Sequence, residues 1–232
     1  MLHMKYTKST TPTRNTKRAQ MSDEQEIDYG KQIDQYDWIE YIRYPESRSL
    51  DGQEPFVINV LRQKQNGYYV EIGANHPFVA NNTSLLESKF NWSGVGIEIE
   101  EKFVKEYNEK RKNECVLADA MSFDYKQYFV ENNFPKQIDY LQIDIDDNPR
   151  HANLKALIQL PLAEYRFSVI TFEHGAAIDY TLEDMKRAQR LILSSYGYQL
   201  VVQENNEDWW VDPTAVPGEN YWTMFTIGRF MH

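Results

Sequence analysis

Between residues 53 and 202, short apolar runs alternate with amphipathic stretches, and this alternation constrains the fold more than any other feature of the chain. The apolar runs are rich in aromatic and β-branched residues, as buried strands are, and lie at 68–72, 94–99, 115–118, 138–143, 167–172 and 198–202. The stretches around them predict helices over 53–61, 83–90, 101–112, 123–130, 151–160 and 181–196. Strands that alternate with helices of this length predict an α/β fold, with a parallel sheet covered on both faces.

The last predicted helix has the clearest start signal. Thr181 and Asp184 form a variant capping box, and Gly197 ends the helix. A further apolar segment at 221–227 is predicted as the seventh strand.

The first 52 residues lack this pattern. Residues 1–22 are basic and polar without periodicity, which predicts a basic flexible tail. Residues 23–52 mix acids with aromatic residues, and they predict an N-terminal extension with a short helix over 33–42. Residues 53–232 then form the main α/β domain.

Composition excludes several classes of protein. The net charge of −10 argues against a nucleic-acid-binding surface. No apolar run is long enough to cross a bilayer, and no hydrophobic segment follows the first four residues, so we expect neither a membrane span nor a secretory signal. Cys115 is the only cysteine, which excludes intramolecular disulfides and cysteine-built zinc sites. We therefore expect a cytoplasmic protein, and its oligomeric state is left open.

Acidic residues recur at the carboxyl ends of the predicted strands. In an open parallel sheet these ends share one rim, where ligands bind. One acid at such a position is usually a helix cap, but five in succession predict a ligand site. They are Glu71 or the turn after it, Glu98, Asp119, Asp144 and Glu173.

The turn at 71–75 indicates what the ligand is. Gly73 allows the backbone either a positive φ or a close approach to a ligand, and Asn75 tolerates similar turn geometry. Glu98 ends the second strand, where an acid can hold ribose hydroxyls. The dinucleotide-binding pattern Gly-x-Gly-x-x-Gly is absent, so a nucleoside ligand without phosphates fits better. S-adenosylmethionine is such a ligand, and acidic walls favour its sulfonium charge.

Four segments of the chain together resemble the FkbM family of S-adenosylmethionine-dependent methyltransferases in order, spacing and residue type. They are residues 71–75, 82–87, 92–98 and 138–146. The resemblance covers about residues 53–227, and 207–211 is also similar. It implies a Rossmann-like class I methyltransferase fold in 53–232, with a mostly parallel seven-stranded sheet. It further implies O-methylation, often of a sugar or glycan-linked acceptor.

The resemblance also assigns residues by position. It implies that Glu71, Gly73 and Asn75 hold the methionine end of the cofactor, that Glu98 holds the ribose, and that Asp119 holds the adenine amino group. Asn82 and Thr83 would flank the pocket. The chain departs from the family at two positions: His76 stands where the family often has Asp, and Asp147 where it frequently has Gly. His76 could alter the cofactor turn or face the substrate.

Methyl transfer needs the acceptor oxygen in line with the sulfonium carbon, and a base for the hydroxyl proton. Asp144 is the first candidate for positioning or deprotonating the acceptor, followed by Glu173 and His174. A structural histidine explains His174 about equally well. The acceptor would be a small molecule or a glycan.

Asp144 and Asp146 permit a second interpretation. Alternate residues of a strand face the same way, so both carboxylates could reach one divalent metal ion. A metal-dependent nucleotide-sugar glycosyltransferase uses such a pair, although the turn at 71–75 is then unexplained. A third alternative is a non-catalytic member of the methyltransferase fold.

Overall fold

The computed structural model describes residues 42–145, 150–204 and 206–216. The predicted tail at 1–22, the predicted strand at 221–227, nearly all of the predicted helix over 33–42, and both Asp146 and Asp147 lie outside these ranges. Residues 43–52 form loops and turns that lead into the first described helix.

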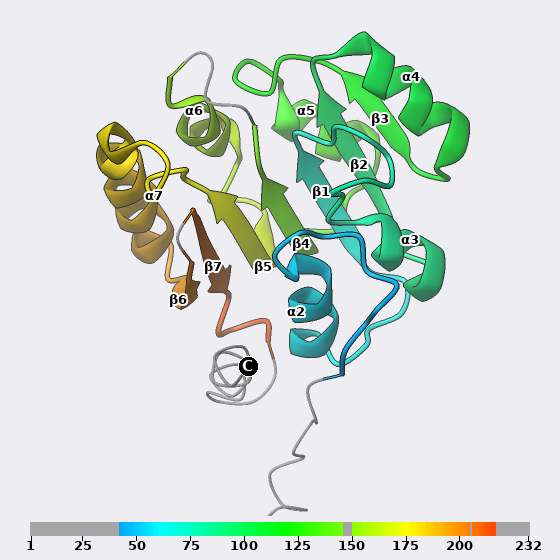
Figure 1. The fold of residues 1–232 in the computed structure, drawn as a ribbon, viewed down its shortest axis with the longest axis horizontal. Coiled ribbons are helices and arrows are strands. Elements are labelled where there is room, and N and C mark those ends of the chain that lie inside the picture. Colours follow the sequence, from blue (N-terminus) through cyan, green and yellow to red (C-terminus); the bar gives the residue numbers. More distant parts are fainter. Residues whose placement is uncertain (1–41, 146–149, 205, 217–232) are drawn as a thin grey trace, which may run out of the picture. The chain divides into compact units, whose positions relative to one another are not determined.

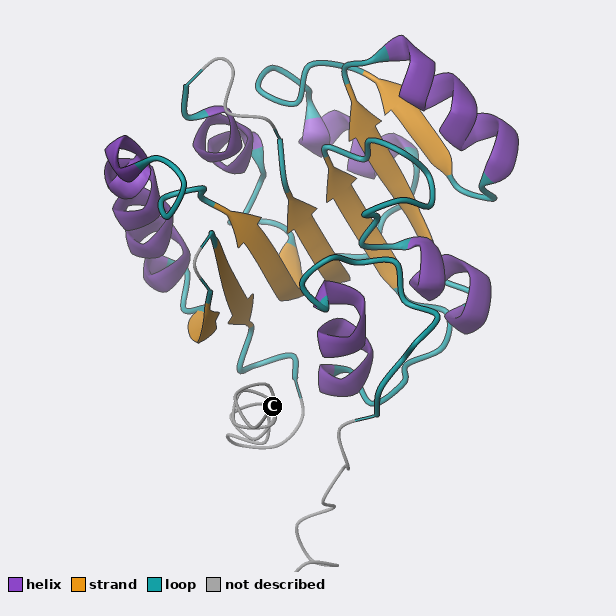
Figure 2. Cartoon of the chain, in the orientation of Figure 1, coloured by secondary structure: helices purple, strands orange, loops and turns teal. Residues whose placement is uncertain are grey.

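The described residues form a seven-stranded sheet in the order β3-β2-β1-β4-β5-β7-β6 (Figures 1 and 2). Strands β1 to β5 pair in parallel, and β7 runs antiparallel to both of its neighbours. This confirms the predicted, mostly parallel seven-stranded sheet. The strands are β1 (Tyr68–Ile72), β2 (Ser93–Glu98), β3 (Glu114–Leu117), β4 (Gln137–Ile143), β5 (Arg166–Glu173), β6 (Gln199–Gln203) and β7 (Glu207–Val211).

Helices cover both faces of the sheet, which is why the central strands are apolar on both sides. Val70 and Leu141 pack with side chains of α5 (Tyr125–Glu131), α6 (Ala152–Gln159) and α7 (Glu183–Ser195). Tyr69 and Tyr140 point to the opposite face and pack with α2 (Gln53–Val60) and α3 (Ser84–Phe90). Helix α4 (Glu101–Lys110) lies on that second face as well, because its Tyr107 hydroxyl lies 2.9 Å from that of Tyr69.

The predicted capping box of the last helix is wrong. Thr181 lies in the 3₁₀ turn η1 (Tyr180–Leu182), whose N-cap is Asp179. The Asp179 Oδ1 accepts a hydrogen bond from the Thr181 amide at 2.8 Å. Helix α7 begins only at Glu183, and no side chain caps it. The Asp179 side chain closes a turn before the helix starts, and this displaces Thr181 from the capping position.

The seventh strand of the described sheet is Glu207–Val211, which the strand pattern missed. All five of its residues are buried, although two are acids. Asp208 is paired with Arg190 at 2.6 Å, and Glu207 accepts hydrogen bonds from Gln53 and Trp209. Hydrogen bonds and an ion pair to Glu207 and Asp208 therefore allow this segment to form a buried strand, although two acids at its start predict an exposed segment.

Candidate functional site

Three neighbouring cavities follow the edge of the sheet at which β1, β2, β4 and β5 end. Strand β7 begins at the same edge because it runs the opposite way (Figure 1). The small cavity has a volume of about 80 Å³, the central cavity about 700 Å³ and the outer cavity about 270 Å³. The small and central cavities share Gly73, Glu98, Ile99 and Ile145 in their walls. The central and outer cavities share Ile145 and Glu173.

Most of the residues predicted from the sequence line these cavities. Thr83 lies outside all three cavity walls, while His174 lines only the outer cavity. Asp119 lines the small cavity. The central cavity is lined by Glu71, Gly73, Asn75, Asn82, Glu98, Asp144 and Glu173.

Gly73 makes the turn at the end of β1 for two physical reasons. Its φ is +83°, in the left-handed region, and a Cβ there would lie 1.8 Å from the Asp144 carbonyl oxygen. The Gly73 amide donates to the Ile97 carbonyl at 2.9 Å, and the Asp144 amide donates to the Ile72 carbonyl at 3.0 Å. The positive φ predicted as one alternative for Gly73 is therefore observed, and its close backbone contact is with the end of β4.

The loop after Gly73 is held by side-chain acceptors. Asn75 has a φ of 47°, and its amide donates to Glu98 Oε2 at 2.8 Å. The His76 Nδ1 accepts hydrogen bonds from the amides of Phe78 at 3.1 Å and Val79 at 3.0 Å. A carboxylate at this position could accept the same kind of bond, so His76 fills a turn-forming role.

Glu98 stands between the small and the central cavity and is 8% exposed. Its Oε1 accepts hydrogen bonds from the amides of Ile99 and Glu100, each at 2.8 Å. Its Oε2 accepts the Asn75 amide. A carboxylate oxygen can accept two hydrogen bonds, so Oε2 is the oxygen with capacity for a ligand donor.

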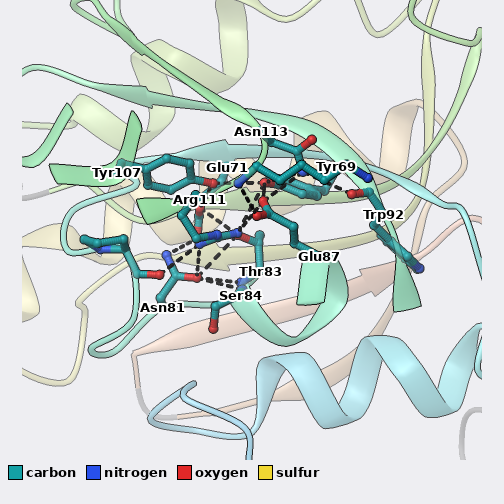
Figure 3. A network of polar contacts seen from close by, with 12 residues as sticks. Tyr69, Glu71, Asn81, Thr83, Ser84, Glu87, Trp92, Tyr107, Arg111 and Asn113 are labelled. Carbon is teal, nitrogen blue, oxygen red and sulfur yellow. Dashed lines mark hydrogen bonds and ion pairs between the residues drawn. The ribbon is translucent and has the colours of Figure 1, made fainter. Parts of the chain in front are cut away.

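Glu71 belongs to a buried polar network on the face of α3 and α4 (Figure 3). Thr83 Oγ1 donates to its Oε2 at 2.8 Å, and Asn81 Nδ2 donates to its Oε1 at 3.0 Å. Burial raises the pKa of Glu71 to about 7, against the lowering effect of the Arg111 charge. The network explains how a carboxylate can stand inside an apolar strand.

Arg111, just after α4, is the cation of this network, and only 2% of its side chain is exposed. It pairs with Glu87 at 3.1 Å and donates to Asn81 Oδ1 and Thr83 Oγ1, each at 3.1 Å (Figure 3). Asn81 also accepts the Ser84 amide at 2.8 Å, at the start of α3. Sequence reasoning missed both Arg111 and Asn81, because neither lies at the end of a strand.

Two buried side-chain oxygens in the wall of the central cavity lack a hydrogen-bond partner among the described residues. They are Asn82 Oδ1 and Gln142 Oε1, in side chains that are 5% and 2% exposed. Buried polar atoms are nearly always hydrogen-bonded, so these oxygens point to a ligand that donates hydrogen bonds.

The central cavity is strongly acidic. Among its described lining residues there is no Lys or Arg, whereas seven are carboxylates: Asp51, Glu71, Glu98, Glu100, Asp144, Glu173 and Glu207. Such a wall favours a cationic or neutral ligand and repels an anion.

The small cavity is apolar by comparison, with Ile97, Ile99, Ala118 and Met121 in its walls. Asp119 adds a carboxylate, which accepts the Met121 amide at 2.9 Å. A small, mostly apolar cavity with the carboxylates of Asp119 and Glu98 in its wall suits a flat ring that carries an amino group.

Glu207 is a cavity residue that sequence reasoning missed. It is 8% exposed and lies directly opposite Glu173 across the β5–β7 pair. Its Oε1 accepts from Gln53 Nε2 at 2.7 Å, and its Oε2 accepts from Trp209 Nε1 at 2.6 Å. Burial, together with the negative charge of Asp144, raises its pKa to about 7.

His174 is held in a buried arrangement. Its Nδ1 accepts the Ala176 amide at 3.1 Å, so the neutral ring carries its proton on Nε2. Nε2 lies 3.7 Å from Asp208 Oδ1, and Asp208 is itself paired with Arg190. These contacts favour a structural role for His174.

The predicted metal pair has only one member within the described ranges, since Asp146 lies outside them. Among the residues that the structure describes, no three His, Cys, Asp or Glu side chains are grouped so that they could hold a metal ion. In the same part of the chain, no helix has the length and apolar character needed to span a bilayer.

No protein-family model and no curated protein matches the chain. The order of the first five strands, β3-β2-β1-β4-β5, is that of a doubly wound Rossmann-like sheet, and of the seven described strands only β7 is reversed.

The chain is similar to a TehB-like SAM-dependent methyltransferase from Corynebacterium glutamicum, with 12% identity over 71% of this chain and 89% of that one and a TM-score of 0.45. The human methyltransferase 10 domain containing protein gives 12% identity over 77% and 90%, with a TM-score of 0.45. An O-methyltransferase from Bacillus cereus in complex with SAH gives 16% identity over 78% and 87%, with a TM-score of 0.43.

Proposed function

We propose that this protein is an S-adenosylmethionine-dependent methyltransferase of the FkbM type, which methylates a hydroxyl group of a sugar or glycan. The observation that carries the proposal is the position of Glu98. Its carboxylate joins a narrow apolar cavity to a wide acidic one and also holds the turn that begins at Gly73. A nucleoside with a cationic, amino-acid-like extension fits such a pair of cavities.

The residues present fit the cofactor from one end to the other. The small cavity would take the adenine, with Asp119 beside it, and Glu98 Oε2 would accept a ribose hydroxyl. Asn82 Oδ1 offers an acceptor to an ammonium group in the central cavity. Glu71 would act indirectly, because its oxygens are already engaged by Thr83 and Asn81.

When bound, S-adenosylmethionine supplies a methyl group on a positively charged sulfur. The chain must hold the acceptor oxygen in line with that group and remove its proton. Asp144 and Glu173 end adjacent parallel strands at the wall of the central cavity, where both could hold an acceptor hydroxyl. We assign these two residues to acceptor positioning.

Ligand titrations test the proposal. Calorimetry and thermal unfolding are measured with S-adenosylhomocysteine, and in parallel with UDP-sugars plus Mn²⁺. A ligand that binds only the folded chain raises its stability, by about 4 kcal/mol at a thousand times its Kd. We expect S-adenosylhomocysteine to raise the Tm and UDP-sugars to leave it unchanged.

Two other outcomes contradict the proposal. Stabilisation by the UDP-sugar alone would identify a glycosyltransferase. Binding of S-adenosylhomocysteine without methyl transfer to any of a panel of glycans would identify a non-catalytic protein. Glu109→Gln, on the exposed side of α4, is the matched control for carboxylate substitutions in the site.

A further inference from the structure

We propose that Glu207 and Glu173 form the subsite that binds the methyl acceptor. Glu207 takes the proton of the acceptor hydroxyl. The acceptor is a neutral or cationic polyhydroxy compound that carries no phosphate or carboxylate group. This inference rests on the proposed function and specifies the substrate class of the same site. It is carried by the geometry of β5 and β7.

Glu173 and Glu207 are directly opposite each other in the antiparallel register of β5 and β7. Opposite residues of an antiparallel pair project from the same face, so both carboxylates face the central cavity, whose wall includes them. Like charges at such positions destabilise a sheet. A ligand that donates hydrogen bonds to both carboxylates would relieve the repulsion.

The Glu207 carboxylate is held in one orientation. Gln53 donates to Oε1 from α2, and the buried indole of Trp209 donates to Oε2 from the same strand. Each oxygen accepts one hydrogen bond in these contacts and keeps capacity for a second. A carboxylate fixed in this way is suited to receive a proton from a hydroxyl at a defined place.

Gln142 gives a second indication of a ligand that donates hydrogen bonds. Its Oε1 is buried without a partner among the described residues, and the side chain is 2% exposed in the wall of the same cavity. Gln142 is in register with Thr171, which lies two residues before Glu173 and on the same face of β5. Gln142 Oε1 therefore lies in the same cavity wall as the carboxylates of Glu173 and Glu207, and this wall favours hydroxyl or ammonium groups over phosphate and carboxylate groups.

The ionisation of Glu207 suits the step. Its pKa is raised to about 7 by burial and by the charges of Asp144 and Asp51, while its hydrogen bonds from Trp209 and Gln53 oppose the rise. Glu173 adds a further carboxylate from β5. A base with a pKa near the working pH is the most effective.

The reaction balances without a further reactant. As the acceptor oxygen bonds to the methyl carbon and the carbon–sulfur bond breaks, the hydroxyl proton passes to Glu207. The sulfur keeps the electron pair of the broken bond and loses its positive charge. Glu207 is left as a neutral carboxylic acid, which then releases its proton to water.

Sugars matched in shape and different in charge test the subsite. Binding to the protein saturated with S-adenosylhomocysteine is measured by saturation-transfer NMR for methyl glucoside, glucosamine, glucose 6-phosphate and glucuronate. We expect glucosamine and methyl glucoside to bind at least tenfold more tightly than the two anions. Equal binding of all four, tighter binding of the anions, or binding of none overturns the subsite.

Substitutions test whether the two carboxylates cause the preference for neutral or cationic sugars over anionic ones. Glu207→Gln keeps the shape and removes the charge, and we expect it to reduce the preference for glucosamine over glucose 6-phosphate at least fivefold. Glu173→Gln should act in the same direction, and it serves as the second variant if the first does not fold. Glu109→Gln should leave the preference unchanged. An unaltered preference in both cavity variants overturns the proposal.

The ionisation of Glu207 can also be measured directly, in an experiment that does not require methyl transfer. In a ¹³C carboxyl NMR titration, the signal that Glu207→Gln removes should titrate near pH 7, and saturation with glucosamine should lower its midpoint. A titration midpoint that is the same with and without bound glucosamine overturns the proposed contact between the sugar and Glu207. Failure of S-adenosylhomocysteine to bind the wild-type chain overturns the proposed function instead, so the two failures are distinguishable.

Discussion

The Cα of Gly73 packs so closely against the carbonyl oxygen of Asp144 that a Cβ at residue 73 would lie 1.8 Å from that oxygen. The contact joins the ends of β1 and β4, the two strands at the centre of the sheet. It also places Asp144 in the wall shared with the turn. The geometry of the candidate site therefore depends on the absence of one methyl group.

Replacing Gly73 by Ala should destabilise the protein strongly. The left-handed φ alone costs about 1–2 kcal/mol for a residue with a Cβ. The clash with Asp144 adds roughly 1–3 kcal/mol, as overpacking of a rigid contact does. Gly197→Ala is the matched control, because Gly197 has a φ of +82° and nothing within 4 Å of an added Cβ. Urea unfolding of both variants separates the two costs, and equal losses would contradict the close contact.

Arg111→Met should cost about 3 kcal/mol or more. The change removes the cation of a buried pair and leaves Glu87 with an uncompensated charge. It should also raise the pKa of Glu71 further, since the Arg111 charge lowers that pKa. Lys110→Met, at the neighbouring exposed residue, should change stability by less than about 0.5 kcal/mol. The measurement is chemical denaturation, and similar losses in both variants would contradict a structural role for the network.

The pH dependence of stability should report on Glu71. Its pKa is about 7 in the folded state, above the ordinary value of 4.5, so the folded chain binds the proton more tightly than the unfolded chain does. This contribution to stability is complete below about pH 4.5 and is lost as the pH rises to about 7, by up to about 1.4 kcal/mol per pH unit. Glu71→Gln does not titrate, so the difference in unfolding free energy between wild type and variant should fall across this window. A constant difference would show an unshifted carboxylate.

Glu98→Gln should weaken S-adenosylhomocysteine binding by roughly tenfold or more, because a hydrogen bond to a charged acceptor contributes about 1.5–3 kcal/mol. The variant keeps an oxygen for the Ile99 and Glu100 amides, but it places an NH₂ group where Oε2 now accepts from Asn75. Titration calorimetry measures the affinity, and the Tm without ligand checks the fold. An unchanged affinity would remove the ribose assignment.

Much of the fold could be read from the chain because burial on both faces leaves a local signature. Strand β4 carries the apolar residues Ile138, Leu141 and Ile143, and α4 carries Val104 and Tyr107 at helical spacing. Strand β7 has no such signature. Glu207 and Asp208 are buried there only because Gln53, Arg190 and Trp209, from other parts of the sequence and from the strand itself, supply their hydrogen bonds.

The residues of the candidate site also fall into those that the sequence predicts and those that it does not. The rule that acids at the carboxyl ends of parallel strands meet at one rim leads to Glu98, Asp144 and Glu173, and all three line the central cavity. The same rule cannot lead to Glu207, which stands at the amino end of its strand. It reaches the rim because β7 runs antiparallel, and strand direction depends on how distant segments pair.

The sequence by itself therefore determined the alternating α/β architecture, the glycine turn and the parallel strand ends, since periodicity and backbone preference are local properties. Only the tertiary structure decided that Arg111 neutralises the network around Glu71, that His76 closes a loop, and that Glu207 faces Glu173. Each of these is a contact between side chains or strands whose partners are set by packing, and packing is a property of the whole chain.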